Sequence, residues 1–327
     1  MTSSLDSMTR SGFNRTPSLE ETMPENLCTK VGEGVTVGKF YHEVDVSSGI
    51  TREPRPEDVF VVTYFSRSGG DLAQTIIHNI LRGTQPPSAL KVPQPMQVQG
   101  RPASVLTHLP FGLTFRSDRA KYIYIARNPY HCSVLFYEQT LNYEENSTED
   151  ALEGFPGFFE DFINGDAPCG DYLGDVLSWY ERRFDDNVLF LTYEELVDEL
   201  KTTVLRIADF LDEEGEHGQK LRRNRKLLEK ICAEIRCHVD QESAQRVTTL
   251  KEATVAEDCA RPHRDDRLRK SNLVVARQLL LENIEEGKPQ RSISAIFTLD
   301  MVNQLQHRVK AVAGGNCRVV QLWRNCD

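Results

Sequence analysis

The pattern of apolar positions along the 327-residue chain alternates between short runs and helical stripes. Mostly apolar, β-branched and aromatic runs fill residues 59–62, 121–126 and 187–192, and such runs are typical of strands buried on both faces of a parallel sheet. Between and after these runs, apolar residues recur at helical spacing, as in 72–80 and 196–211. This alternation predicts the α/β class: a single domain with a mostly parallel central sheet flanked by helices.

The first strand leads into a glycine-containing turn and then a helix. Residues 66–70 read SRSGG, and the helical stripe that follows ends before Gly83. A strand, a flexible turn and a helix can point backbone N–H groups and a helix N-terminus at an anion. The general phosphate-loop pattern is absent, because no lysine follows Gly69 and no glycine stands at its first position. This stretch alone therefore indicates either an anion site or a plain connection.

Two further strand ends carry residues of chemical interest. His108 ends a short strand over 103–108, and Arg127 directly follows the strand over 121–126. Open α/β sheets place their chemistry at the carboxyl ends of the strands. A histidine can accept a proton near neutral pH, and a guanidinium can hold a phosphate with two donors. Taken alone, the segment favours a hydrogen-bonded structural histidine at 108, and Arg127 is equally a surface arginine paired with an acid.

Later segments complete the expected fold. Four phenylalanines over 155–162 indicate core or pocket-wall packing. Tyr193 starts a helix with acids in its first turn, where the helix dipole favours them. Further helices are expected over 176–183, 221–235, 273–281 and 297–312, and a proline-rich loop over 83–100.

Composition narrows the function classes. The formal net charge of −10 argues against a general nucleic-acid binder, and no apolar run approaches a membrane span. The N-terminus lacks the apolar core of a secretory signal, which favours a cytoplasmic location and reduced thiols for the eight cysteines. Without a C-x-x-C pair, no metal site is expected.

The chain divides into three expected parts. Residues 1–36 are rich in Ser, Thr, Glu and Pro and predict a flexible N-terminal tail. Residues 37–312 are expected to form the folded domain, and residues 313–327, which contain Gly314 and Gly315, are expected to form a C-terminal tail.

Several motifs together resemble those of the cytosolic sulfotransferases, whose opening motif is Tyr-Pro-Lys-Ser-Gly-Thr-Thr-Trp. Residues 64–72, YFSRSGGDL, resemble this motif with one extra residue. Residues 107–111, THLPF, resemble the family's Lys-Thr-His-Leu-Pro motif without its lysine. Residues 122–129, YIYIARNP, match the family almost letter for letter, and residues 176–181 and 187–195 are also similar.

This resemblance implies a P-loop-like strand-loop-helix donor site and a known reaction. The family transfers a sulfuryl group from 3′-phosphoadenylyl sulfate (PAPS) to a hydroxyl or amine of a small acceptor, without a metal. His108 stands at the general-base position, and Arg67 stands where a lysine contacts the leaving phosphate, so both are expected to be catalytic. The donor-binding residues that the resemblance implies are Arg67, Ser68, Gly69, Gly70, Arg127, Tyr193 and Gly287.

The donor site also departs from the family pattern. Asp71 and Leu72 replace a threonine and the tryptophan that stacks on adenine, Leu135 replaces a phosphate-binding serine, and Glu285-Glu286 replaces Arg-Lys. These changes favour an alternative hypothesis: a non-catalytic protein of sulfotransferase fold that binds a small ligand or a partner protein. A nucleoside-type kinase is disfavoured, because no lysine follows Gly69. The sequence leaves the acceptor and a homodimer open.

Overall fold

The structure is a computed structural model. It describes residues 28–31, 35–38, 54–56, 58–65, 68–82, 97–98, 101–102, 104–109, 111–112, 114, 117–143, 154–167, 169–212, 214–241, 297–313 and 322. Among the predicted site residues, Arg67 and Gly287 lie outside this part of the chain, as does the helix expected over 273–281.

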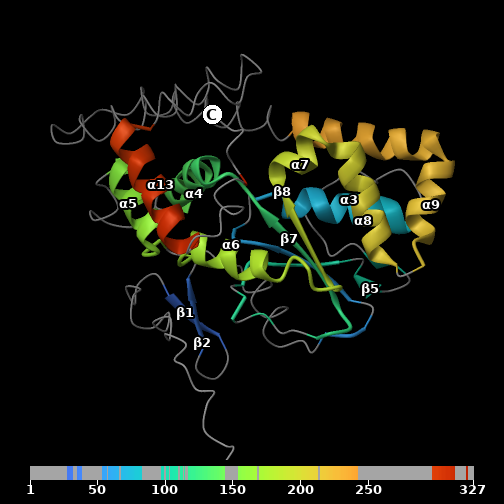
Figure 1. The fold of residues 1–327 in the computed structure, drawn as a ribbon, viewed down its shortest axis with the longest axis horizontal. Helices are drawn as coiled ribbons and strands as arrows, with labels where there is room; N and C mark the ends of the chain where they lie inside the picture. Colours follow the sequence, from blue (N-terminus) through green and yellow to red (C-terminus); the bar gives the residue numbers. More distant parts are fainter. Residues whose placement is uncertain are drawn as a thin grey trace, which may run out of the picture.

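A four-stranded parallel sheet forms the centre of the fold (Figure 1). Its strands lie in the order β6 (Val105–Thr107), β3 (Val59–Thr63), β7 (Lys121–Ala126) and β8 (Val188–Thr192). All three pairings are parallel, as buried strands joined by helices require. The α/β class that the sequence predicted is confirmed.

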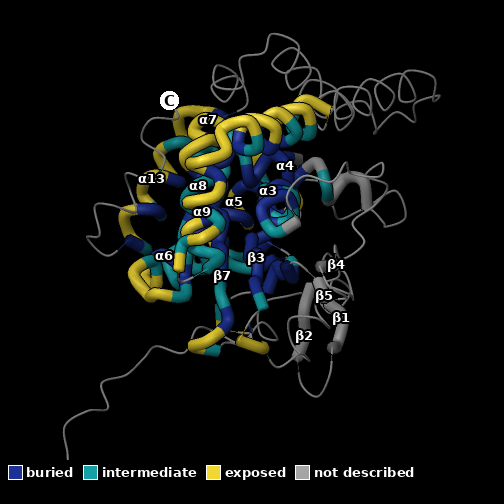
Figure 2. The backbone as a smooth tube through the Cα atoms, turned by 90° about the vertical axis from the view of Figure 1, so that its right-hand side faces the viewer, coloured by how far each residue is buried: buried dark blue, intermediate teal, exposed yellow. Residues whose placement is uncertain are grey.

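Helices cover both faces of this sheet, as Figure 1 shows. One face packs against α3 (Gly70–Arg82), α7 (Tyr193–Asp198), α8 (Leu200–Leu211), α9 (Glu216–Arg223) and a helix over 225–241. The other packs against α4 (Pro129–Tyr143), α5 (Gly154–Asn164), α6 (Tyr172–Glu181) and α13 (Leu299–Ala313). Helices α8, α9 and α13 bury one side and expose the other (Figure 2), whereas α4 has no exposed residue among those described.

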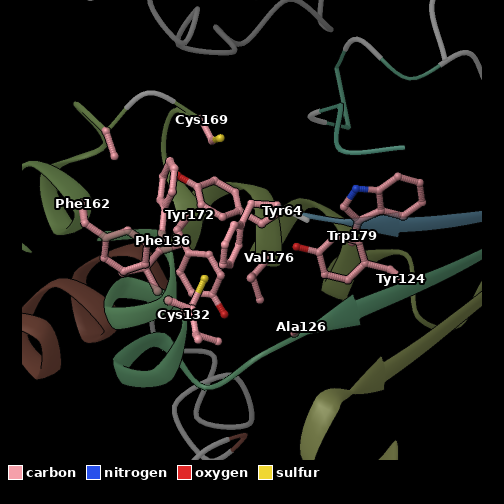
Figure 3. Close-up of a cluster of buried hydrophobic side chains, with 14 of the residues drawn as sticks. Tyr64, Tyr124, Ala126, Cys132, Phe136, Phe162, Cys169, Tyr172, Val176 and Trp179 are labelled. Atoms are coloured by element: carbon pink, nitrogen blue, oxygen red, sulfur yellow. The ribbon is translucent and has the colours of Figure 1, made fainter. Parts of the chain in front are cut away.

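Side chains of β7 alternate between two cores. Tyr122 and Tyr124 join the core under α4, α5, α6 and α13, whereas Ile123 and Ile125 join the core on the opposite face. The first core is rich in aromatic rings, several of which are drawn in Figure 3. The phenylalanines over 155–162 belong to it, so their predicted packing role is confirmed.

Two long helices expected from the apolar pattern are each interrupted. The stripe over 196–211 is divided at Glu199, which has φ −111° and ψ 32° and separates α7 from α8. The stripe over 221–235 is divided at Asn224, whose Oδ1 accepts a hydrogen bond from the N–H of Leu227 at 3.1 Å. Apolar periodicity continues across both breaks because the two halves still face one core.

Two short antiparallel hairpins lacked a recognisable sequence pattern. β1 (Cys28–Val31) pairs with β2 (Val35–Gly38), and β4 (Gln97–Val98) pairs with β5 (Arg101–Pro102). Strands of two to four residues are too short for periodicity to reveal. The first hairpin crosses the boundary at residue 36 that was expected to separate tail from domain.

Candidate functional site

The strand order has a topological switch point between β3 and β7. From β3 the chain passes through α3 to β6 on one side, whereas β7 lies on the other side. Where the connections from two neighbouring strands leave in opposite directions, ligands usually bind outside the carboxyl ends of those strands. The residues that follow β3 and β7 include Ser68, Gly69, Gly70 and Arg127. The structure therefore brings these predicted site residues to one edge.

Gly69 lies where the loop after β3 enters α3. Its φ of +98° belongs to the left-handed region that favours glycine, and its carbonyl accepts the N–H of Ala73 at 3.1 Å. A Cβ at this position would lie 2.8 Å from Cδ2 of Tyr193. The loop therefore passes so close to the Tyr193 ring that only glycine fits without displacement.

Ser68 and Gly70 flank this close approach. The Ser68 N–H donates to the Phe65 carbonyl at 3.2 Å, so this amide closes the turn inside the loop. Gly70 is the first residue of α3 and backs directly onto the Leu106 side chain. Because α3 has 13 residues, its dipole places partial positive charge at this loop.

Arg127, which directly follows β7, also contacts the Tyr193 ring. Its guanidinium carbon is 3.8 Å from the centroid of that ring, which is a close cation–π contact. The hydroxyl of Tyr172 donates to the Arg127 carbonyl and holds the backbone at this turn. Gly69, Tyr193 and Arg127 thus form one contiguous group, although they are far apart in sequence.

A buried carboxylate beside this group was not singled out from the sequence. Glu194 Oε1 accepts the N–H of Asn128 at 3.0 Å, and Asn128 Oδ1 in turn accepts the N–H of Tyr130 at 2.9 Å at the start of α4. Burial raises the pKa of Glu194, while the Asn128 N–H and Arg127 lower it. In the sequence, Glu194 was recognisable only as an acid in the first turn of a helix, a position that the helix dipole favours in any helix.

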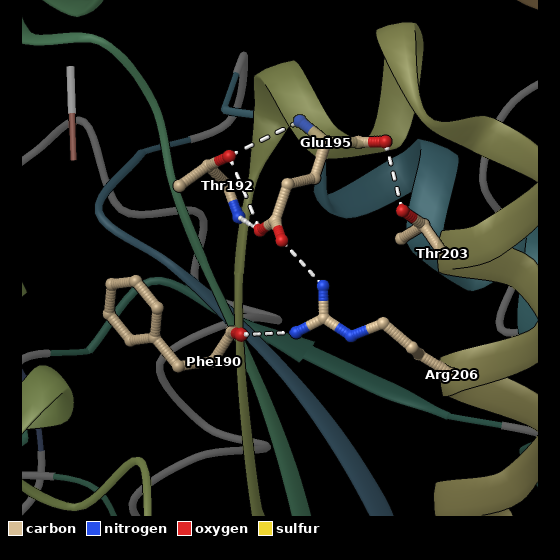
Figure 4. A network of polar contacts seen from close by, with 5 residues as sticks. All are labelled: Phe190, Thr192, Glu195, Thr203 and Arg206. Atoms are coloured by element: carbon tan, nitrogen blue, oxygen red, sulfur yellow. Dashed lines mark hydrogen bonds and ion pairs between the residues drawn. The ribbon is translucent and has the colours of Figure 1, made fainter. Parts of the chain in front are cut away.

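A polar network fixes the first turn of α7 (Figure 4). Thr192 and Glu195 form a reciprocal capping box, with the Thr192 N–H donating to Glu195 Oε2 at 2.8 Å and the Glu195 N–H to Thr192 Oγ1 at 3.2 Å. Arg206 from α8 donates to Glu195 Oε1 at 2.5 Å, and Thr203 donates to the Glu195 carbonyl at 2.9 Å. This network fixes the position from which Tyr193 reaches the loop.

His108 follows β6 and is 6% exposed. Its Nδ1 lies 3.1 Å from the Thr63 carbonyl oxygen and 2.8 Å from Thr63 Oγ1. The carbonyl can only accept, and the Thr63 hydroxyl donates its proton to the Phe65 carbonyl at 3.1 Å. Nδ1 therefore carries the ring proton, and Nε2 holds the lone pair of the neutral imidazole.

The departures from the family pattern have different surroundings. Leu72 is 4% exposed in the aliphatic core, and Leu135 is 4% exposed in the aromatic core. Asp71 lies in the first turn of α3 and is exposed. Burial in the two cores directs both leucines away from a solvent-accessible ligand. Glu285 and Glu286 lie outside the described residues.

Within the described residues, no cluster of three or more His, Cys, Asp or Glu side chains is arranged to hold a metal ion. The cysteines at 132, 169, 232 and 237 are free thiols. None of the described helices combines the length and the apolar character needed to cross a membrane.

Comparison with known proteins identifies the family. The model of the sulfotransferase domain matches residues 7–254, and the chain therefore belongs to this family. An amine sulfotransferase of Oryctolagus cuniculus is 28% identical over 179 residues, covering 50% of this chain and 58% of that protein. Sulfotransferase 2B1 of Homo sapiens is 31% identical over 211 residues, covering 59% of this chain and 56% of that protein.

The matches to both relatives span less than two thirds of the relatives' own length. A solved structure gives wider coverage at the level of the fold. The crystal structure of mouse sulfotransferase SULT7A1 complexed with PAP has a TM-score of 0.56 and 20% identity, and covers 92% of this chain and 100% of that chain. This likeness supports the sulfotransferase fold found here.

Proposed function

We propose that the chain transfers a sulfuryl group from PAPS to a small acceptor, with His108 as the general base. The observation that carries this proposal is the hydrogen bonding of His108 Nδ1 to Thr63, which leaves the lone pair on Nε2. A neutral imidazole with a fixed tautomer is suited to accept a hydroxyl or amine proton near pH 7.

The donor site of the proposal lies at the same edge of the sheet. The loop at Gly69 and Gly70, the N-terminus of α3 and the Arg127 cation suit a nucleotide with phosphate groups. Tyr193 contacts both Gly69 and Arg127 and supplies an aromatic surface. Ser68, Arg67 and Gly287 are proposed as further donor contacts, on the family resemblance alone.

The proposed reaction depends on positioning the donor and the acceptor and on stabilising the charge of the leaving group, rather than on a covalent intermediate with the enzyme. The acceptor oxygen or nitrogen attacks sulfur as the bond from sulfur to the phosphate oxygen breaks. The acceptor proton passes to His108 Nε2, and negative charge develops on the leaving phosphate. Arg67 and the amides of the loop are proposed to stabilise that charge.

Calorimetric titration with adenosine 3′,5′-bisphosphate tests donor binding first. We expect binding by the purified chain, and no heat at millimolar nucleotide would overturn the proposal. We then expect His108→Ala to abolish transfer to a phenol while nucleotide affinity changes little. His307→Ala on the exposed side of α13 is the matched control and should keep full activity. Loss of nucleotide binding in His108→Ala would instead make this histidine structural.

A second candidate function is a ligand-binding protein without catalysis. Leu72 and Leu135 favour it, because both lie in apolar cores at positions where the family has ligand contacts. Acceptor binding with no transfer in the presence of PAPS would support this candidate. A cytoplasmic location and a homodimer are further parts of the hypothesis, tested by cell fractionation and by the molar mass in solution.

A further inference from the structure

Two residues of α6 each have a buried polar atom that lacks a hydrogen-bond partner among the described residues. Asp175 and Trp179 stand one turn apart on this helix, and residues four positions apart lie side by side. Asp175 Oδ1 and Trp179 Nε1 have no hydrogen-bond partner among the residues that the structure describes. Trp179 is only 1% exposed. Buried donors and acceptors are costly when unpaired, so such a pair suggests that another molecule supplies the partner.

Aromatic rings surround this pair. Trp179 stacks on Tyr124 with ring centroids 5.4 Å apart (Figure 3). It also meets Phe111 edge-on with ring centroids 5.0 Å apart. Tyr124 also stacks on Phe190 at 5.4 Å, and its hydroxyl donates to Asp175 Oδ2 at 2.7 Å. The Tyr124 hydroxyl and the backbone N–H of Phe111 thus hold the Asp175 carboxyl in place. Its Oδ1 is buried without a geometrically formed hydrogen bond among the described residues.

The same surroundings connect the pair to His108. Tyr124 and Thr107 both lie opposite Val62, one on each side of it, so they stand at one level of the sheet. Two strand spacings separate them, on the order of 10 Å. His108 follows Thr107 directly, and the backbone N–H of Phe111, in the loop after His108, faces Asp175. The pair and the base thus flank the same loop.

We propose that Trp179 Nε1 and Asp175 Oδ1 bind a hydroxyl group of the acceptor that is remote from the group being sulfonated. The inference deepens the proposed transferase function and rests on it. A hydroxyl is the group that can donate to the carboxylate and accept from the indole N–H at once. An ammonium group offers only donors, so one of its N–H groups would face the indole N–H. The site therefore favours a second hydroxyl over an amine.

The protonation of Asp175 is compatible with this role. Burial raises its pKa to about 7, against the lowering effects of the Tyr124 hydroxyl and the Phe111 N–H. Near neutral pH the carboxyl can therefore either accept the hydroxyl proton or share its own proton with the hydroxyl oxygen. Both arrangements satisfy the acceptor without a cation.

The test compares two rigid probes, biphenyl with a hydroxyl at one end and biphenyl with a hydroxyl at both ends. Binding of each is measured by calorimetry in wild type, in Trp179→Phe and in Tyr180→Phe. Trp179→Phe removes the indole N–H and keeps an aromatic ring. Tyr180→Phe is the matched control, because Tyr180 packs toward Ala313 rather than toward Tyr124. For each variant, the ratio of its affinities for the two probes is the same whether or not part of the sample is unfolded.

We expect wild type and Tyr180→Phe to prefer the two-ended probe by about tenfold, the worth of one buried polar contact. In Trp179→Phe this preference should fall to about twofold or less. Equal affinity for both probes in wild type overturns the inference, as does a preference that survives Trp179→Phe. A buried water at this pair would also overturn it, shown by a lower melting temperature of Trp179→Phe without any probe preference in wild type. Titration of adenosine 3′,5′-bisphosphate on the same samples shows separately whether donor binding, and with it the proposed function, fails.

Discussion

The two faces of the central sheet differ in chemistry. The core against α3, α7 and α8 is aliphatic, and its buried described members include no aromatic ring. The core against α4, α5, α6 and α13 contains aromatic rings together with buried polar groups such as the Tyr124 hydroxyl and Asn128. The first face therefore packs mainly aliphatic side chains, with buried polar residues such as Asn79 and Thr203 on its helices. The second face combines aromatic rings with buried polar groups.

In the proposed function, the aliphatic face positions the donor-site residues and the aromatic face recognises the acceptor. The aliphatic face carries α3 and α7, which position Gly69 and Tyr193 at the sheet edge. The aromatic face carries Asp175 and Trp179, the two residues of the proposed acceptor site. The indole ring of Trp179 and the polar atoms of both residues suit an aromatic acceptor that carries a hydroxyl. Changes on the first face should alter stability or donor binding, and changes on the second should alter acceptor recognition.

A cavity in the aliphatic core should have the largest effect. Ile77 is 0% exposed on α3, and Ile77→Ala should lower the free energy of unfolding by about 3–4 kcal/mol through lost burial and a residual cavity. Denaturant unfolding measures this loss. The ratio of the two biphenyl affinities should stay unchanged. A changed ratio would show that the two faces are not independent.

The buried carboxyl on the aromatic face should make stability depend on pH. The pKa of Asp175 is about 7 in the folded chain and 3.8 for the ordinary group. Its contribution is fully present below the unfolded pKa and is lost as pH rises through the folded pKa. As pH rises from the ordinary pKa to the folded pKa, the free energy of unfolding of the wild type should therefore fall by on the order of 2 kcal/mol relative to that of Asp175→Asn.

Urea unfolding at several pH values between those two pKa values measures this loss. The charged and titratable groups that interact with Asp175 are Tyr124 from β7, Asp171 before α6 and Tyr172 at the start of α6, and all three remain in the variant. Asp166→Asn, at an exposed position, serves as the control. Parallel pH profiles of wild type and Asp175→Asn would contradict the prediction.

The close approach of the Gly69 backbone to the Tyr193 ring should be disturbed by a single added methyl group. Gly69→Ala combines a strained positive φ with a contact to Tyr193, and should cost about 1–2 kcal/mol and weaken nucleotide binding about tenfold. Gly215→Ala is the control, because Gly215 has φ +67° with nothing within 4 Å of the added Cβ. Equal nucleotide affinity in both variants would mean that the Tyr193 contact does not shape the site.

The smallest effect should come from the network behind Tyr193. Arg206 and Glu195 pair at 2.5 Å with side chains 40% and 31% exposed, so Arg206→Ala should cost only about 0.5–1 kcal/mol of stability. Nucleotide affinity should fall two- to threefold, because Tyr193 is held less firmly. Arg222→Ala removes the exposed pair with Asp209 and should leave nucleotide affinity unchanged. Calorimetry on both variants makes the comparison.

The sequence alone determined which residues form the sheet and how they face. In β7 the order Tyr122, Ile123, Tyr124, Ile125 assigns aromatic and aliphatic side chains to opposite faces, because successive residues of a strand point in opposite directions. Local motifs also indicated His108 and Arg127, since each ends a recognisable strand. Both kinds of signal are local, so a single sequence contains them.

Only the tertiary structure decided which distant residues meet. The order of strands in a parallel sheet is set by long-range packing, and it brings Tyr193 to Gly69 and Arg127. Across the helix break at Glu199, Thr203 and Arg206 of α8 contact Glu195 of α7, and the apolar pattern reveals neither contact. Asp175 and Trp179 read as ordinary residues of an amphipathic helix. Their unpaired atoms become visible only once the rings of Tyr124 and Phe111 enclose them and exclude solvent.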